Sequence, residues 1–212
     1  MGRAVELGSL VHRLMEHADF SQGPAGLETA LAALDPDPDL AEQALSLATR
    51  LWDTELPGEL AGAAELGREL PFCLRLPEQE GGPALEIIGE IDLAAKLSGG
   101  WLVADYKVSH KADPAPYRDQ MALYALALHK GDGGIGPAPR CCLVFLTPQG
   151  AKLAWLNFTP DDLTAMEARV RAAAQAIAAL GPQPDPAALE PGAACDPTLC
   201  PVAHLCGLED GS

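Results

Sequence analysis

The spacing of hydrophobic residues changes along the chain, and each change predicts a different kind of element. Over 7–20 the apolar side chains recur every three or four positions, which predicts a helix. The same spacing predicts a second helix over 38–52. Asp37 is a candidate N-cap for this helix, and Pro38 fits its first turn, where a backbone N–H would be unpaired anyway.

From Glu69 the pattern becomes typical of strands. The acidic Gly-Gly-Pro stretch 77–83 predicts a hairpin loop, and Ser98-Gly99-Gly100 predicts a tight turn. Three hydrophobic segments flank these two turns, at 69–76, 85–97 and 101–108. We therefore expect an antiparallel three-stranded meander over 69–108.

The second half of the chain repeats this change of period. A helical pattern over 115–129 is followed by a glycine-rich loop over 131–136. A strongly apolar strand and its partner are predicted within 141–158. The helix predicted over 160–180 has the start signals of a threonine cap, a proline at the first position and two aspartates in the first turn.

This order of elements predicts an α/β fold with a central mixed sheet flanked by helices. Hydrophobic residues make up 48% of the 212 residues, which is enough for a real core. We expect one domain over 1–182. A linker and a cysteine-containing C-terminal tail follow it over 183–212.

Charge and composition exclude several classes of protein. The chain has 30 Asp or Glu against 14 Lys or Arg, a net charge of −16, so it is not a free-standing non-specific DNA binder. No apolar run approaches the roughly 20 residues that span a bilayer, and the amphipathic start is not a signal peptide. Six cysteines without a secretory signal indicate a reducing compartment, so we expect a cytoplasmic protein.

The segment around residue 105 holds the most informative polar residues. Asp105 and Lys107 are two apart on a predicted strand, so they share a face, while Tyr106 points to the other side. The preceding strand can bring Asp92 beside Asp105. Two adjacent carboxylates suit a divalent cation, and a lysine beside them can stabilise developing phosphorane charge. The alternative is an ordinary exposed ion pair, but an acid within the apolar run LVADYKV weakens it.

Two predicted helices carry further candidates. On the first, Gly8 and His12 share a face with Glu16, so His12 can be a metal ligand or simply a packed or surface histidine. On the helix after the D-x-K strand, Gln120 and Tyr124 continue a stripe that starts at Tyr117. This stripe can reach the site, or its tyrosines can belong to the core.

Together these residues form an ordered series that resembles the RecB-like nuclease family of the PD-(D/E)XK superfamily. The resemblance covers about residues 8–124. In chain order the series is Gly8/His12, Glu69-Leu70-Pro71-Phe72, Gly89-Glu90-Ile91-Asp92, Asp105-Tyr106-Lys107 and Gln120/Tyr124.

The resemblance implies a PD-(D/E)XK restriction-endonuclease-like core and a DNA nuclease that depends on Mg²⁺ or Mn²⁺. It implies that Lys107 is the catalytic lysine and that Gln120 and Tyr124 line the site. The metal ligands would be His12, Asp92, Asp105 and the Tyr106 carbonyl. Such domains often work with a fused or separate helicase in DNA recombination and repair, so we expect DNA and a helicase as partners, and an exonuclease activity.

The tail carries a second candidate metal site. Some relatives hold an iron–sulfur cluster with a similar tail, and Cys200 and Cys206 match its spacing while Cys195 departs from it. His204 offers a fourth ligand for zinc. The alternative is a loose tail with free thiols. For a cluster, the other cysteines available as the fourth ligand are Cys73, Cys141 and Cys142, all in predicted strands.

The acidic balance leaves open how DNA would be held. Cations sit in or near the motif elements, at Arg3, Arg13, Lys107, Lys111, Arg118 and Lys130. Only seven residues precede Gly8, so we expect an excised or very small domain. Such a domain would bind DNA weakly alone and would obtain most of its DNA affinity from elsewhere. Two other interpretations compete with an active nuclease: a catalytically silent nuclease-fold scaffold of a helicase complex, and a metal-binding interaction domain centred on the tail.

Overall fold

The computed structural model describes residues 2–79, 84–134 and 136–179, and it divides the chain into two units, Met1–Ala168 and Arg169–Ser212. In the second unit the described residues form the C-terminal part of one helix. The predicted linker and tail over 183–212, with Cys195, Cys200 and Cys206, lie outside the described residues. None of the helices described is long and apolar enough to cross a membrane.

Five strands form one mixed sheet in the order β1-β2-β3-β4-β5. Neighbouring strands are antiparallel except β3 and β4, which are parallel, so the α/β class with a mixed central sheet is confirmed. The predicted meander corresponds to the first three strands. Their bounds are β1 Glu65–Leu76, β2 Leu85–Leu97, β3 Gly100–Val108, β4 Arg140–Thr147 and β5 Gly150–Leu156.

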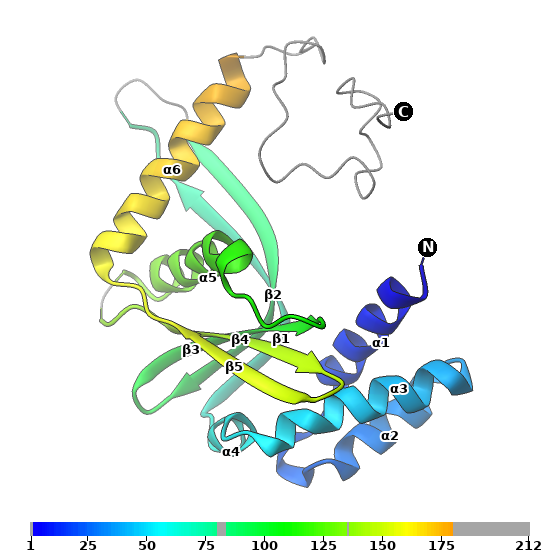
Figure 1. The fold of residues 1–212 in the computed structure, drawn as a ribbon. Coiled ribbons are helices and arrows are strands. Elements are labelled where there is room, and N and C mark those ends of the chain that lie inside the picture. Colours follow the sequence, from blue (N-terminus) through cyan, green and yellow to red (C-terminus); the bar gives the residue numbers. More distant parts are fainter. Residues whose placement is uncertain (1, 80–83, 135, 180–212) are drawn as a thin grey trace, which may run out of the picture. The chain divides into compact units, whose positions relative to one another are not determined.

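Helices α1 to α4 pack on one face of this sheet, and α5 lies on the other (Figure 1). Alternate residues of β2, β3 and β4, such as Leu93, Ala104 and Val144, point into the core beneath α1 to α4. The helix bounds are α1 Arg3–His17, α2 Ala25–Leu34, α3 Pro38–Thr49, α4 Leu56–Ala61 and α5 Arg118–Gly131.

Local signals set several of these ends. Asp37 caps α3, because its side chain accepts hydrogen bonds from the backbone N–H groups of Asp39 and Leu40. Helix α6 (Pro160–Ala179) begins at a reciprocal cap in which the Thr159 N–H donates to Asp162 and the Asp162 N–H donates back to the Thr159 hydroxyl. Helix α5 makes the crossover between the two parallel strands.

The first hairpin extends beyond the sheet. Strands β1 and β2 pair as far as Leu76 with Leu85, but β2 and β3 pair only as far as Leu93 with Ala104. The outer segments 70–76 and 85–91, here called the β-arm, therefore pair only with each other among the strands that the structure describes. In Figure 1 the β-arm rises past α5. Its base, where β2 leaves β3, is where the polar residues gather.

Candidate active site

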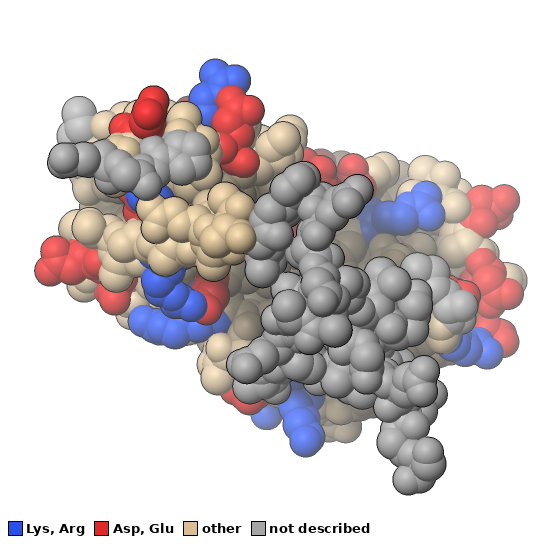
Figure 2. All heavy atoms as spheres, turned by 90° about the horizontal axis from the view of Figure 1, so that it is seen from above, with Lys and Arg blue, Asp and Glu red and all other residues tan. Residues whose placement is uncertain are grey.

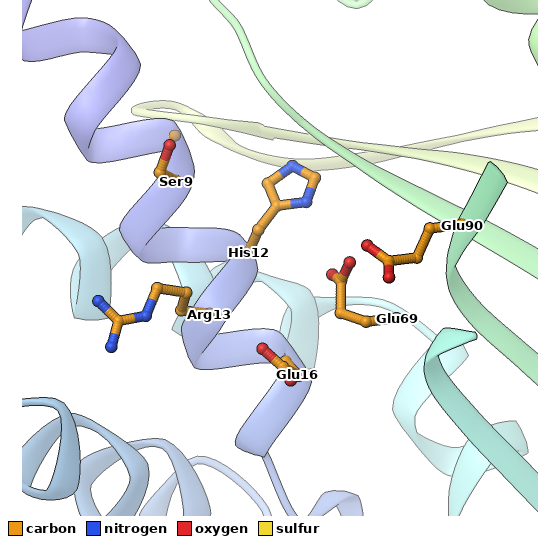
Figure 3. Close-up of a pocket in the computed structure, with 7 residues that line it drawn as sticks. Ser9, His12, Arg13, Glu16, Glu69 and Glu90 are labelled. Atoms are coloured by element: carbon orange, nitrogen blue, oxygen red, sulfur yellow. The ribbon is translucent and has the colours of Figure 1, made fainter. Parts of the chain in front are cut away.

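Three elements bring metal-ligating side chains together at the base of the β-arm. His12 comes from α1, Glu69 from β1 and Asp92 from β2, and one ligand atom from each lies within 4.8 Å of the others. His12 Nδ1 lies 3.3 Å from Asp92 Oδ2. In Figure 3 His12 points from α1 toward Glu69 and Glu90. A histidine nitrogen and two carboxylates form a donor set suited to a divalent cation.

Asp92 also takes part in the sheet. The register that pairs Leu93 with Ala104 would set Asp92 opposite Asp105, but the ladder stops there. Instead, the Tyr106 backbone N–H donates a 2.8 Å hydrogen bond to Asp92 Oδ2. The carboxylate thus satisfies a β3 donor at the point where β2 leaves the sheet.

Asp105 and Lys107 lie side by side on the face of β3 toward α5, as their spacing predicts. Asp105 is fully buried, and Lys107 Nζ lies 2.7 Å from its Oδ2. The ring of Tyr117 lies 4.8 Å from the same Nζ. Tyr106 points the other way into the core, so the atom that it can offer as a metal ligand is its backbone carbonyl oxygen.

Helix α5 supplies a hydrogen bond to Asp105. Gln120 Nε2 lies 3.1 Å from Asp105 Oδ1 and 2.8 Å from the Tyr124 hydroxyl, so its amide can donate to both. The Tyr124 ring packs edge-on against Phe72 of the β-arm. The stripe predicted on this helix therefore reaches the polar cluster, and Tyr124 also packs.

Two acids in the cluster are hard to ionise. Burial, with the negative charge of Asp92, raises the pKa of Asp105 to about 6, although Lys107 and His12 oppose the shift. Burial raises the pKa of Glu69 to about 7, together with a hydrogen bond to Glu90 and the charge of Asp92. A bound divalent cation would remove the repulsion between these carboxylates. The residues present therefore fit a divalent metal.

Glu69 belongs to one of the motifs that carry the resemblance, but it is not among the predicted site residues. Its backbone adopts a left-handed conformation with φ of +43°, unusual for a residue other than glycine, at the base of the β-arm. Glu69 and His12 line a cavity of about 580 Å³. The other residues that line it are Gly8, Ser9, Arg13, Glu16 and Glu90. An acid opposite Asp92 in the hairpin was the available signal.

The cysteines that the structure describes differ in access. Burial raises the pKa of the Cys141 and Cys142 thiols to about 12, and both are fully enclosed in the core. Cys73 is exposed on the β-arm. Among these three, Cys73 is therefore the one able to join an outside ligand set, and a metal at Cys195, Cys200 and Cys206 stays a prediction.

Comparison with known proteins places these features in a family. The family model of the PD-(D/E)XK nuclease superfamily matches residues 1–207. An ATP-dependent helicase/nuclease subunit from Heliobacterium modesticaldum is 33% identical in an alignment of 118 residues, and the match covers 49% of this chain and 8% of that protein. The exonuclease/helicase subunit RexA of Lactococcus lactis subsp. cremoris is 30% identical in an alignment of 139 residues, and the match covers 60% of this chain and 11% of that protein. The chain thus spans about a tenth of the length of these curated relatives.

A solved structure shares the fold. The crystal structure of a candidate exonuclease from Eubacterium rectale has a TM-score of 0.53 with this chain at 15% sequence identity. The match covers 96% of this chain and 74% of that one. At this identity the likeness concerns the fold alone.

Proposed function

Because this chain belongs to the PD-(D/E)XK nuclease superfamily, we propose that it is a metal-dependent nuclease that hydrolyses phosphodiester bonds in DNA. One observation carries the proposal. The ion pair of Asp105 with Lys107 lies beside a cluster of His12, Glu69 and Asp92, so a catalytic lysine and a set of metal ligands share one site. A scaffold that had lost catalysis would not need to keep a buried acid with a raised pKa.

Mg²⁺ or Mn²⁺ would be held by His12, Asp92, Asp105 and the backbone carbonyl of Tyr106. Glu69 adds a carboxylate to this set, within reach of the first two. When bound, such a cation supplies Lewis-acid polarisation of the scissile phosphate and lowers the pKa of a water molecule. Oxygen-rich ligand sets favour these hard ions over softer metals.

The remaining residues act on the phosphate and on the ligands. Lys107, 19% exposed, can donate a hydrogen bond to a phosphate oxygen as negative charge develops on it. Gln120 orients Asp105 through its 3.1 Å hydrogen bond, and Tyr124 in turn fixes the Gln120 amide. A loss of either helix residue would loosen Asp105 without removing it.

The biological setting follows from the relatives. Two of them are named as helicase–nuclease subunits, and this chain matches a short part of each. We infer an exonuclease that acts in the cytoplasm in DNA recombination or repair, joined to or partnered by a helicase. The net charge of −16 supports a partner, because the chain itself offers little bulk affinity for phosphate.

The deciding experiment is hydrolysis of end-labelled single- and double-stranded DNA with Mg²⁺ or Mn²⁺. Wild type is compared with Lys107→Ala and with the control Lys130→Ala, whose lysine pairs with Glu167 on the protein surface. We expect metal-dependent cleavage that falls about 100-fold or more in Lys107→Ala and persists in the control. A folded, metal-bound wild type that cleaves neither substrate would instead favour the catalytically silent scaffold.

A further inference from the structure

Most cations that the structure describes are already engaged by a neighbour. Arg68 donates to the Ala18 carbonyl, and Arg118 lies over the Phe158 ring. A cation in a close ion pair has little net charge to offer a phosphate. Apart from Lys107, which belongs to the candidate active site, the ion pairs are Arg3–Asp39, Arg50–Asp53, Arg75–Glu86, Lys96–Asp132, Lys130–Glu167 and Arg140–Glu59.

Three cations differ from these. Arg13, Lys111 and Lys152 are exposed, and within the described part of the chain their side chains have no ion pair, hydrogen bond or ring contact. On the face drawn in Figure 2, outside the grey atoms, Lys and Arg occur in small separate groups and not as one basic patch. The unpaired cations are therefore the positive charges available for a polyanion.

Two of them lie near Lys107, one in the sheet and one in the chain. Lys107 pairs with Phe145 in the parallel ladder, and Phe145 pairs with Lys152 in the next, so the three residues form a row across β3, β4 and β5. Residues in register share a face, and two strand spacings separate the Cα atoms of the two lysines by about 10 Å. Lys111 follows the end of β3 by three residues.

The third cation comes from α1, beside the metal-ligand candidates. Arg13 follows His12 on α1 and lines the same cavity as Glu69. In Figure 3 its guanidinium extends away from the carboxylates of Glu69 and Glu90, which explains why it pairs with neither. Arg13 is thus the chain neighbour of the metal-ligand candidate His12, and Lys152 lies in register with Lys107.

We propose that Arg13, Lys111 and Lys152 are phosphate contacts that hold one nucleic acid strand across the sheet, with the scissile phosphate between them at the metal ligands. This inference rests on the proposed function, because it assigns the path of that enzyme's substrate. The strand passes over α1 and β1 on one side and over the ends of β3 to β5 on the other. Each contact releases condensed counterions from the nucleic acid, so each contributes a measurable share of the salt dependence of binding.

The first test is the salt dependence of binding to a fluorescent oligodeoxynucleotide, single-stranded and duplex, in EDTA so that no cleavage occurs. Test variants are Arg13→Gln, Lys111→Gln and Lys152→Gln, and matched controls are Arg75→Gln and Arg3→Gln, whose cations are paired. We expect each test variant to reduce the slope of log K against log salt by about 0.7 for single strands or 0.9 for duplex. Unchanged slopes in the test variants, or equal losses in the controls, would overturn the proposal.

The second test is kinetic and separates this proposal from the proposed function. In a wild type that cleaves DNA, Lys152→Gln is expected to raise KM about 3- to 10-fold at nearly constant kcat, because the lost contact lies away from the reacting phosphate. Lys152→Glu should raise KM further. Cleavage by wild type with the same KM in both variants refutes the strand path alone, whereas no cleavage by wild type refutes the proposed function.

Discussion

Glu69 occupies its place in the site with a backbone conformation that glycine would adopt more easily. Its φ of +43° costs about 1 kcal/mol or more for a residue with a Cβ, and its carboxylate faces other acids. We expect Glu69→Gly to raise the free energy of unfolding by about 1 kcal/mol relative to Glu69→Gln, which keeps the Cβ.

Both Glu69 variants should bind Mn²⁺ more weakly than wild type, because each removes a carboxylate near His12 and Asp92. Urea denaturation and calorimetric metal titration measure the two effects separately. Equal stability of the glycine and glutamine variants would show that the left-handed backbone carries no strain.

The side chain and the backbone of Tyr106 have different surroundings and different proposed roles. The hydroxyl is buried without a hydrogen-bond partner among the described residues, while the backbone carbonyl is a proposed metal ligand. Tyr106→Phe should therefore stabilise the fold by about 1 kcal/mol and leave metal affinity and cleavage unchanged. Thermal unfolding and the cleavage assay test this, and a large loss of metal affinity in the phenylalanine variant would mean that the hydroxyl has a role of its own.

Several side-chain positions were predictable from the sequence, and others were not. Alternation along the β3 segment predicts that Asp105 and Lys107 share a face while Tyr106 is in the core, and the structure confirms this. Helical spacing brings Gln120 and Tyr124 to the cluster. The participation of Glu69 was harder to predict, because its left-handed backbone angle is not encoded by a residue pattern and the available signal was an acid opposite Asp92 in the hairpin.

The β-arm connects its own packing to the site through α5. Gly89 lies against Phe72 so closely that an added Cβ would come within 2.6 Å of the ring, and Phe72 packs on Tyr124. Gly89→Ala must displace this ring, so we expect a loss of about 1–3 kcal/mol in the free energy of unfolding. The same substitution at Gly99, where an added Cβ meets no atom within 4 Å, is the control.

Cleavage should fall in Gly89→Ala even under conditions where the variant is fully folded, since Tyr124 holds the Gln120 amide that orients Asp105. Urea denaturation with single-turnover kinetics distinguishes the two losses. Full activity in a destabilised Gly89→Ala protein would show that the β-arm only packs.

Elements with a clear period were predictable, and short or uniformly apolar ones were not. The strands and the helices at α1, α3, α5 and α6 lie close to the predicted bounds. Helix α2 was missed because its Ala- and Leu-rich sequence has no polar face, and α4 because Pro57 and Gly58 resemble loop residues. The division at residue 182 stays a prediction, since the described residues end at 179.

For the molecule as a whole, the acids of the site make stability depend on pH. The raised pKa values mean that the metal-free folded protein keeps protons on Asp105 to about pH 6 and on Glu69 to about pH 7, whereas the unfolded chain loses them near pH 4. Between these limits the folded state binds more protons, so these groups lower the free energy of unfolding as pH rises.

We expect this contribution to be smaller in Asp105→Asn, and excess Mn²⁺ to reverse it, because metal binds the deprotonated acids. At 100-fold excess over its Kd the ion would add about 2.7 kcal/mol. Thermal unfolding at about pH 5 and about pH 8, with and without Mn²⁺, checks the sign. A metal-free profile that rises through this range and is identical in Asp105→Asn would contradict the assignment.

The hydrogen bond from the Tyr106 N–H to Asp92 has a consequence for how such a chain would change if selection for cleavage were relaxed. Replacing Asp105 by asparagine removes a buried charge and its repulsion with Asp92 and keeps an oxygen that can accept from Lys107, so drift would meet little resistance to that change. Replacing Asp92 leaves a strand donor without its acceptor where the β-arm departs, which drift would tolerate poorly. In members of the family without nuclease activity we therefore expect Asp105 to be replaced early and Asp92 to persist, so a surviving Asp92 says little about activity and an intact Asp105–Lys107 pair says much.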